Sequence, residues 1–220
     1  MEVQEFAKYI DHTNLKANAT EKDIKKLCQE ARDHGFYSVC VHPYWVNYCH
    51  TELFNTDVKV CSVIGFPLGA STDHVKAFEA SEAVKNGADE LDYVINISAL
   101  KDGDYNYLKR EAVVIREAAE KSTIKAIIET SYLTREEIKN ISILLDEQQI
   151  DFVKTSTGFS GEGAKEADVK LMNKSVKRAY IKASGGIRSL EKAEIMIKAG
   201  ADRLGLSSSV VLIEELSKAD

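Results

Sequence analysis

Eight short runs rich in β-branched and apolar residues alternate with eight stretches of helical pattern along this chain of 220 residues. Such alternation is typical of right-handed βαβ units around a parallel sheet. The runs predict strands over residues 7–15, 37–43, 58–67, 90–96, 124–130, 151–157, 180–184 and 202–208. Because eight units in roughly 200 to 250 residues fit a closed barrel, the sequence predicts an α/β fold, a single-domain (β/α)8 TIM barrel over residues 1–220.

Capping and turn residues support the repeated units. Thr20 and Asp23 have the spacing of a capping box, and Gly35 is placed to end the helix that follows. The segments KNGADELDYV and KAGADRLGLS resemble one helix-to-strand turn used twice. The alternative fold is an open doubly wound sheet, which usually carries GxGxxG after its first strand. The chain lacks that motif, so the barrel is favoured.

Ionisable residues interrupt five of the predicted strands, although lysine and aspartate are seldom buried unless paired. These residues are Asp11, Asp92, Lys125, Lys154 and Lys182. Alternate strand residues of a barrel point inward, and barrel enzymes keep their chemistry at the mouth, the C-terminal end of the strands. We therefore expect the five groups to converge there. A structural network of ion pairs is the alternative, but the cost of burying several charges together, with lysine in excess, favours catalysis.

Two of these residues, Lys154 in FVKTSTGF and Lys182 in YIKASGGIR, suggest one kind of chemistry. A free lysine is almost wholly protonated at neutral pH, and is then no nucleophile. Burial and a second cation both favour the neutral amine, which can attack an aldehyde or ketone and form a Schiff base. The reaction also needs a proton shuttle, and Asp92 is placed to act directly or through a water molecule.

Glycine and serine residues follow the last two predicted strands, in SGGIR from Ser184 and GLSSS from Gly205. Backbone N–H groups at a helix N-terminus bind anions, and barrels often hold phosphate in these two loops. Glycines also occur in ordinary turns. Their position beside the two lysines favours phosphate binding, and the expected substrate is a phosphorylated carbonyl compound.

The chain resembles the 2-deoxyribose-5-phosphate aldolases, a family of class I aldolases, over nearly its whole length. The similarity extends through IDHTNL, VCVHP, VIGFPLG, ELDYVIN, KAIIETSYL, VKTSTGF, KASGGIR and GLSSS. The resemblance implies reversible cleavage of 2-deoxy-D-ribose 5-phosphate to D-glyceraldehyde 3-phosphate and acetaldehyde. It places the Schiff base on Lys154, gives Lys182 an assisting role in proton transfer, and makes Asp92 the acid/base. Alternatives are another Schiff-base phosphosugar lyase or transaldolase, and a non-catalytic phosphosugar-binding barrel.

The same resemblance implies further site residues. Phosphate binding is expected at Gly185, Gly186, Ser207 and Ser208. Supporting positions in the pocket are expected at Asp11, Lys125 and Thr157. Some relatives carry a lysine where this chain has Phe159, so a phosphate contact from that position is not carried over. The resemblance implies no metal and no organic cofactor, and it suggests a homodimer.

Composition excludes several other classes of function. A net charge of −6 argues against a general nucleic-acid-binding surface. No apolar run has the length of a membrane span, and the N-terminal MEVQEFAKYI does not resemble a signal peptide. A cytoplasmic protein is therefore expected, with its four cysteines reduced. The five histidines show no HExxH pattern, and Cys40 is expected to be a buried apolar residue rather than a catalytic one.

Overall fold

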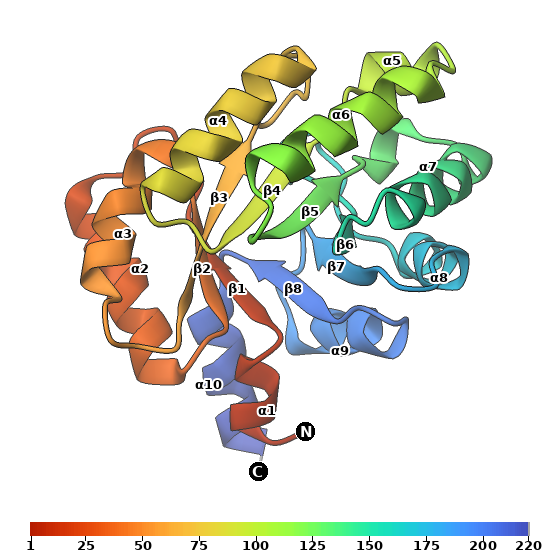
Figure 1. Cartoon of the computed structure of the whole chain (residues 1–220). Helices are drawn as coiled ribbons and strands as arrows, with labels where there is room; N and C mark the ends of the chain where they lie inside the picture. The colour runs from red at the N-terminus through yellow and green to blue at the C-terminus, as the bar shows by residue number, and fades with distance from the viewer. Residues whose placement is uncertain (220) are drawn as a thin grey trace.

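The computed structural model describes residues 1–219 and contains a closed barrel of eight parallel strands in sequence order (Figure 1). The last strand pairs with the first, which closes the sheet. The strands are β1 (Ile10–Thr13), β2 (Ser38–Val41), β3 (Lys59–Ile64), β4 (Glu90–Val94), β5 (Thr123–Ile127), β6 (Phe152–Lys154), β7 (Tyr180–Ser184) and β8 (Arg203–Leu206). The predicted (β/α)8 barrel is confirmed.

Helices surround the barrel and connect its strands (Figure 1). They are α1 (Val3–Ala7), α2 (Glu21–His34), α3 (Val46–Glu52), α4 (Asp73–Lys85), α5 (Ile97–Lys101), α6 (Tyr105–Ala118), α7 (Arg135–Glu147), α8 (Glu166–Ser175), α9 (Leu190–Lys198) and α10 (Ser209–Ala219), with 3-10 turns η1 (Pro43–Trp45) and η2 (Thr130–Tyr132). The first and last helices, α1 and α10, pack against each other. Within residues 1–219, each helix is too short or too polar to cross a membrane.

The local signals that define the repeated units appear in the structure. Thr20 and Asp23 form the predicted capping box, and Gly35 ends α2 in the left-handed region at φ 66°. The two repeated turns also match. Asp89 accepts a hydrogen bond from the backbone N–H of the preceding strand in the barrel at 2.9 Å, and Asp202 accepts the equivalent bond at 2.8 Å. Each turn therefore fixes the start of its strand against a neighbour.

Seven of the eight strands are shorter than predicted, mainly at their C-terminal ends, and β7 has the predicted bounds. The predicted strand 151–157 ends at Lys154, because the next residue, Thr155, exchanges side-chain hydrogen bonds with the backbone of Ser184, each at 3.0 Å. The sequence reading also missed α1 and α5, which have only five residues each. Asn96 lies just beyond β4 and caps α5, where its Oδ1 accepts a hydrogen bond from Ala99 N at 3.0 Å.

The alternation of side chains along each strand separates two environments. Residues that point outward from the barrel, such as Leu91 and Ile181, join the main hydrophobic core under the helices. Residues that point inward include the charged side chains of the strands, a small apolar cluster of Leu15, Cys40, Cys61 and Val63, and a few further apolar side chains such as Ile127. The apolar burial that stabilises the fold therefore lies mainly outside the barrel, and the interior is left for a polar site.

Candidate active site

Seven ionisable side chains meet inside the barrel, and each is at most 4% exposed. They are Asp11, Glu90, Asp92, Lys125, Lys154, Lys182 and Arg203. Six strands contribute them, since β4 carries two of the carboxylates. So little exposure leaves almost no solvent screening, and the pairing of these charges decides their protonation.

Asp92 is the centre of this network. Its Oδ2 lies 2.7 Å from Lys154 Nζ and 2.7 Å from Lys182 Nζ. Its Oδ1 lies 2.9 Å from Lys125 Nζ and accepts a bond from the Cys61 thiol at 3.1 Å. Burial favours the neutral carboxyl, but the three ammonium groups outweigh it and hold the pKa of Asp92 well below its usual range. Asp92 is therefore a carboxylate at neutral pH.

The two lysines that share Asp92 differ in their other partners. Lys182 also forms an ion pair with Asp11. Burial opposes its charge, yet the two carboxylates raise the pKa of Lys182 above its ordinary value, so it stays cationic. Lys154 has a single carboxylate partner, Asp92, among the residues that the structure describes. The two amines therefore differ in the number of carboxylates that hold them.

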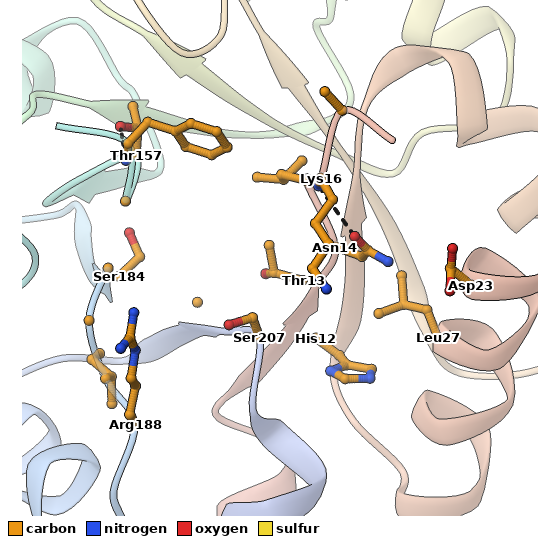
Figure 2. A pocket seen from close by; sticks show the side chains of 18 of the residues that line it. His12, Thr13, Asn14, Lys16, Asp23, Leu27, Thr157, Ser184, Arg188 and Ser207 are labelled. Carbon is orange, nitrogen blue, oxygen red and sulfur yellow. Dashed lines mark hydrogen bonds between the residues drawn. The ribbon is translucent and has the colours of Figure 1, made fainter. Parts of the chain in front are cut away.

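A cavity of about 620 Å³ opens above Lys154 at the mouth of the barrel. In Figure 2, Thr157, Ser184 and Arg188 lie across this space from Asn14 and Lys16, with Ser207 between the two sides. The predicted site residues that line the cavity are Lys154, Thr157, Gly185, Gly186 and Ser207. The other charged residues predicted for the site are fully buried under this floor, namely Asp11, Asp92, Lys125 and Lys182.

The loops after β6 and β7 form one wall of the cavity. Gly185 and Gly186 have φ values of 88° and 67°, a region that other residues rarely adopt. A side chain at Gly163 would meet the Gly185 carbonyl oxygen at 2.0 Å, so the two loops are in direct backbone contact. Ser208, also predicted for phosphate binding, has a buried hydroxyl oxygen without a hydrogen-bond partner in the described part of the chain.

Glu129 supports this wall and was missed by the sequence analysis. Its side chain is buried, and its backbone lies in the left-handed region at φ 54°. Its carboxylate accepts hydrogen bonds from Thr157 N at 3.1 Å, from Thr157 Oγ1, and from Ser160 Oγ at 2.9 Å. A strained backbone next to a functional loop is a recognised sign of a site, but it is not visible in a sequence.

Glu90 and Arg203 were also missed. Glu90 Oε2 lies 2.6 Å from Lys125 Nζ. Arg203 pairs with Asp11 and with Glu90, and its guanidinium lies 3.5 Å from the centre of the Tyr37 ring. A signal existed, because Glu90 stands two positions before Asp92 and must share its face of the strand.

Lys16 and Arg188 line the cavity as well, although neither was singled out from the sequence as a ligand. Figure 2 shows their side chains on opposite sides of the open space, so that each side of the cavity carries a cation. Cys40, Cys61 and Asp92 bring three possible metal-ligand atoms within 4.8 Å of one another. The ammonium groups around Asp92 disfavour a cation at that point.

Comparisons with known proteins agree with the fold and with the motifs. The model of the DeoC/LacD family aldolases matches residues 6–209. A deoxyribose-phosphate aldolase of Thermococcus gammatolerans is 55% identical over 221 residues, covering 98% of each chain. One of Thermoanaerobacter sp. is 52% identical over 217 residues, covering 97% of each. The solved deoxyribose phosphate aldolase of Aeropyrum pernix, described as tetrameric, superposes with a TM-score of 0.93 at 33% identity, covering 100% of this chain and 94% of that one. The resemblance seen in the sequence is confirmed, and this chain belongs to the DeoC/LacD family of aldolases.

Proposed function

We propose that the protein catalyses the reversible cleavage of 2-deoxy-D-ribose 5-phosphate to D-glyceraldehyde 3-phosphate and acetaldehyde through a Schiff base on Lys154. The observation that carries this proposal is the position of Lys154, whose amine reaches the floor of the cavity beside the cationic Lys182 and the ionised Asp92. High identity to several deoxyribose-phosphate aldolases supports the choice of substrate.

The reaction follows from an unprotonated Lys154. The amine attacks the aldehyde carbon of the open-chain sugar, and loss of water gives a protonated imine. The C3 hydroxyl then loses its proton, and the electrons of the C2–C3 bond move into the imine. This step releases D-glyceraldehyde 3-phosphate and leaves an enamine on Lys154. Protonation of the enamine at C2 and hydrolysis release acetaldehyde and restore the amine.

Asp92 and Lys182 move the protons in this scheme. As an ionised carboxylate, Asp92 is suited to accept a proton, and Lys182 is the charged donor that shares its Oδ2 at 2.7 Å. We propose that the two act as a relay, directly or through a water molecule. Lys182 also keeps a positive charge close to Lys154, which favours the neutral nucleophile. Asp11 forms an ion pair with Lys182, and Lys125 forms one with Asp92, so these two residues fix the positions of the relay groups.

The loops after β7 and β8 border the cavity through Gly185, Gly186 and Ser207. We propose that backbone N–H groups at Gly185, Gly186, Ser207 and Ser208 bind the phosphate, next to the start of α10. Arg188 and Lys16 carry positive charges on the two sides of the cavity, and these charges attract the negatively charged phosphate. Phe159 stands where some relatives carry a lysine. Its ring packs edge-on against Phe66, with the ring centroids 5.3 Å apart, and this pair gives the mouth of the barrel an apolar edge.

We also propose that the enzyme acts in the cytoplasm as a homodimer, without a metal or an organic cofactor. All four cysteines are buried free thiols, which agrees with a reducing compartment. The tetramer described for the Aeropyrum pernix relative makes the oligomeric state a question for this chain. Light scattering of the purified protein tests it, and a mass of one or four chains would refute the dimer.

A reductive trap tests the chemistry. The protein is incubated with acetaldehyde, reduced with borohydride and digested, and the modified peptide is identified by mass spectrometry. We expect an ethyl group on Lys154 in the wild-type protein. Lys154→Leu is expected to lose both this label and turnover. The control Lys174→Leu, which changes an exposed lysine of α8, is expected to keep both. A label on Lys182 alone would reverse the two roles. Folded protein without any label would leave only a phosphosugar-binding barrel.

A further inference from the structure

The charged residues below the cavity extend further than the proposed reaction requires. Arg203 pairs with Asp11 and Glu90, Glu90 pairs with Lys125, and Lys125 pairs with Asp92. Glu90 and Arg203 are buried under the cavity floor and reach the site only through their partners. Buried ion pairs are weak contributors to stability, because desolvation offsets their attraction. A chain of such pairs that ends at the proposed nucleophile therefore calls for another explanation.

The charges of this network are balanced in one state only. Its carboxylates are Asp11, Glu90 and Asp92, and its cations apart from Lys154 are Lys125, Lys182 and Arg203. Burial favours the neutral form of each group, but the oppositely charged partners have the larger combined effect. The cations keep the pKa values of the two aspartates low, and the carboxylates keep the pKa values of Lys125, Lys182 and Arg203 high. Three negative charges thus face three positive ones. The interior is neutral when Lys154 is an unprotonated amine, and it carries one excess positive charge when Lys154 is protonated.

Other titratable groups that face the interior do not change this count. Burial raises the pKa of the Cys61 thiol on β3 well above its ordinary value. The neighbouring Cys61 side chain lowers the pKa of Cys40 on β2, and burial opposes this shift. We count Cys40 as a thiol because it packs in the apolar cluster with Leu15 and Val63. Glu129, beyond the end of β5, has its carboxylate bound by the loop after β6. The groups that face one another from the eight strands are Asp11, Cys40, Cys61, Glu90, Asp92, Lys125, Lys154, Lys182 and Arg203.

We propose that Glu90 and Arg203 are positioning residues that balance the charge of the barrel interior, so that Lys154 is held as the neutral amine. The inference rests on the proposed function, since it concerns the nucleophile of that reaction. Glu90 and Arg203 act in opposite directions. Loss of the Glu90 charge leaves the interior more positive and favours the neutral amine, whereas loss of the Arg203 charge favours the ammonium form.

The size of the effect follows from the contacts. The chain of ion pairs places the charged groups of Glu90 and Arg203 within about 12 Å of Lys154 Nζ. At that distance and an effective dielectric constant of about 20, one unit charge shifts the titration midpoint of another group by about one pH unit. The pH dependence of kcat/KM reports ionisations of the free enzyme. In Glu90→Gln, we expect the midpoint of the alkaline-rising limb, the part of the profile in which kcat/KM increases with pH, to move about one pH unit lower. We expect it to move about one unit higher in Arg203→Gln.

Two further variants separate charge from shape. The double variant E90Q/R203Q restores the balance and is expected to keep the wild-type midpoint, even if either single variant fails to fold. Arg203→Lys keeps the charge without the guanidinium, and is expected to keep the midpoint while its kcat falls. Midpoints that do not move, that move in the same direction, or that move in the double variant by more than half a unit would overturn the inference. Absence of turnover in the wild-type protein would instead refute the proposed function.

Discussion

Replacement of Lys182 by methionine separates its charge from its shape. The side chain is fully buried, and methionine is similar in length and flexibility but neutral. Lys182 Nζ and Lys154 Nζ each lie 2.7 Å from Asp92 Oδ2, so the two nitrogens are at most about 5.4 Å apart. We therefore expect Lys182→Met to affect the protonation of Lys154 more than any more distant change.

The magnitude can be worked from that distance. Two unit charges about 5 Å apart at an effective dielectric constant of about 20 interact by about 3 kcal/mol, which is about two pH units. Without Lys182, the positive form of Lys154 is no longer repelled, and the midpoint of the alkaline-rising limb moves up by that amount. At a pH below both midpoints, kcat/KM falls about 100-fold from this effect alone. Loss of the proton donor that we propose Lys182 to be lowers kcat further.

The assay is release of acetaldehyde from 2-deoxyribose 5-phosphate, followed from pH 6 to pH 10. Removal of one partner of a buried pair costs roughly 3–5 kcal/mol, so urea unfolding at each pH must show that the variant is folded. Lys174→Met is the matched control, because it removes the same charge from an exposed position. Lower activity with an unchanged midpoint would refute the electrostatic role and leave Lys182 as a proton donor only.

Two other variants test the cavity wall. Glu129→Gln replaces the carboxylate that accepts hydrogen bonds from Thr157 and Ser160 by a weaker acceptor, an amide. We expect about a tenfold rise in KM with a smaller change in kcat, measured by initial rates. An unchanged KM would contradict this role of Glu129. Arg188→Met is expected to raise KM for 2-deoxyribose 5-phosphate at least tenfold, with little effect on unphosphorylated 2-deoxyribose. An equal loss with both sugars would show that Arg188 does not act on the phosphate.

The strands and the charged residues inside them could be predicted because both depend on local pattern. Residues 180–184 were predicted with the observed bounds of β7, since a short apolar run there lies between polar segments. Lys154 and Lys182 stand out in any such run, because a lysine is rarely buried without a reason. The barrel then follows from the number of units, and the neighbourhood of the two lysines follows from the barrel.

The supporting residues could not be predicted in the same way. In the segment ADRL, Asp202 and Arg203 are adjacent and both are ionisable, but only one can point inward. Asp202 bonds to a backbone N–H at the start of β7, and Arg203 enters the barrel. The choice depends on the register of β8 against its neighbours, which the sequence does not state. Glu129 is harder still, because its left-handed backbone is set by tertiary contacts rather than by its own preference.

Register also explains why two similar lysines can have different tasks. Lys154 and Lys182 are paired positions on the adjacent strands β6 and β7, so both amines reach one carboxylate oxygen from the same face. What distinguishes them is the next strand on each side. Lys182 is followed by β8 and then β1, which brings Asp11 against it. Lys154 is preceded by β5, where its paired position is the apolar Ile127. A second carboxylate thus fixes the charge of Lys182, and the lack of one in the described chain agrees with the role of nucleophile that we propose for Lys154.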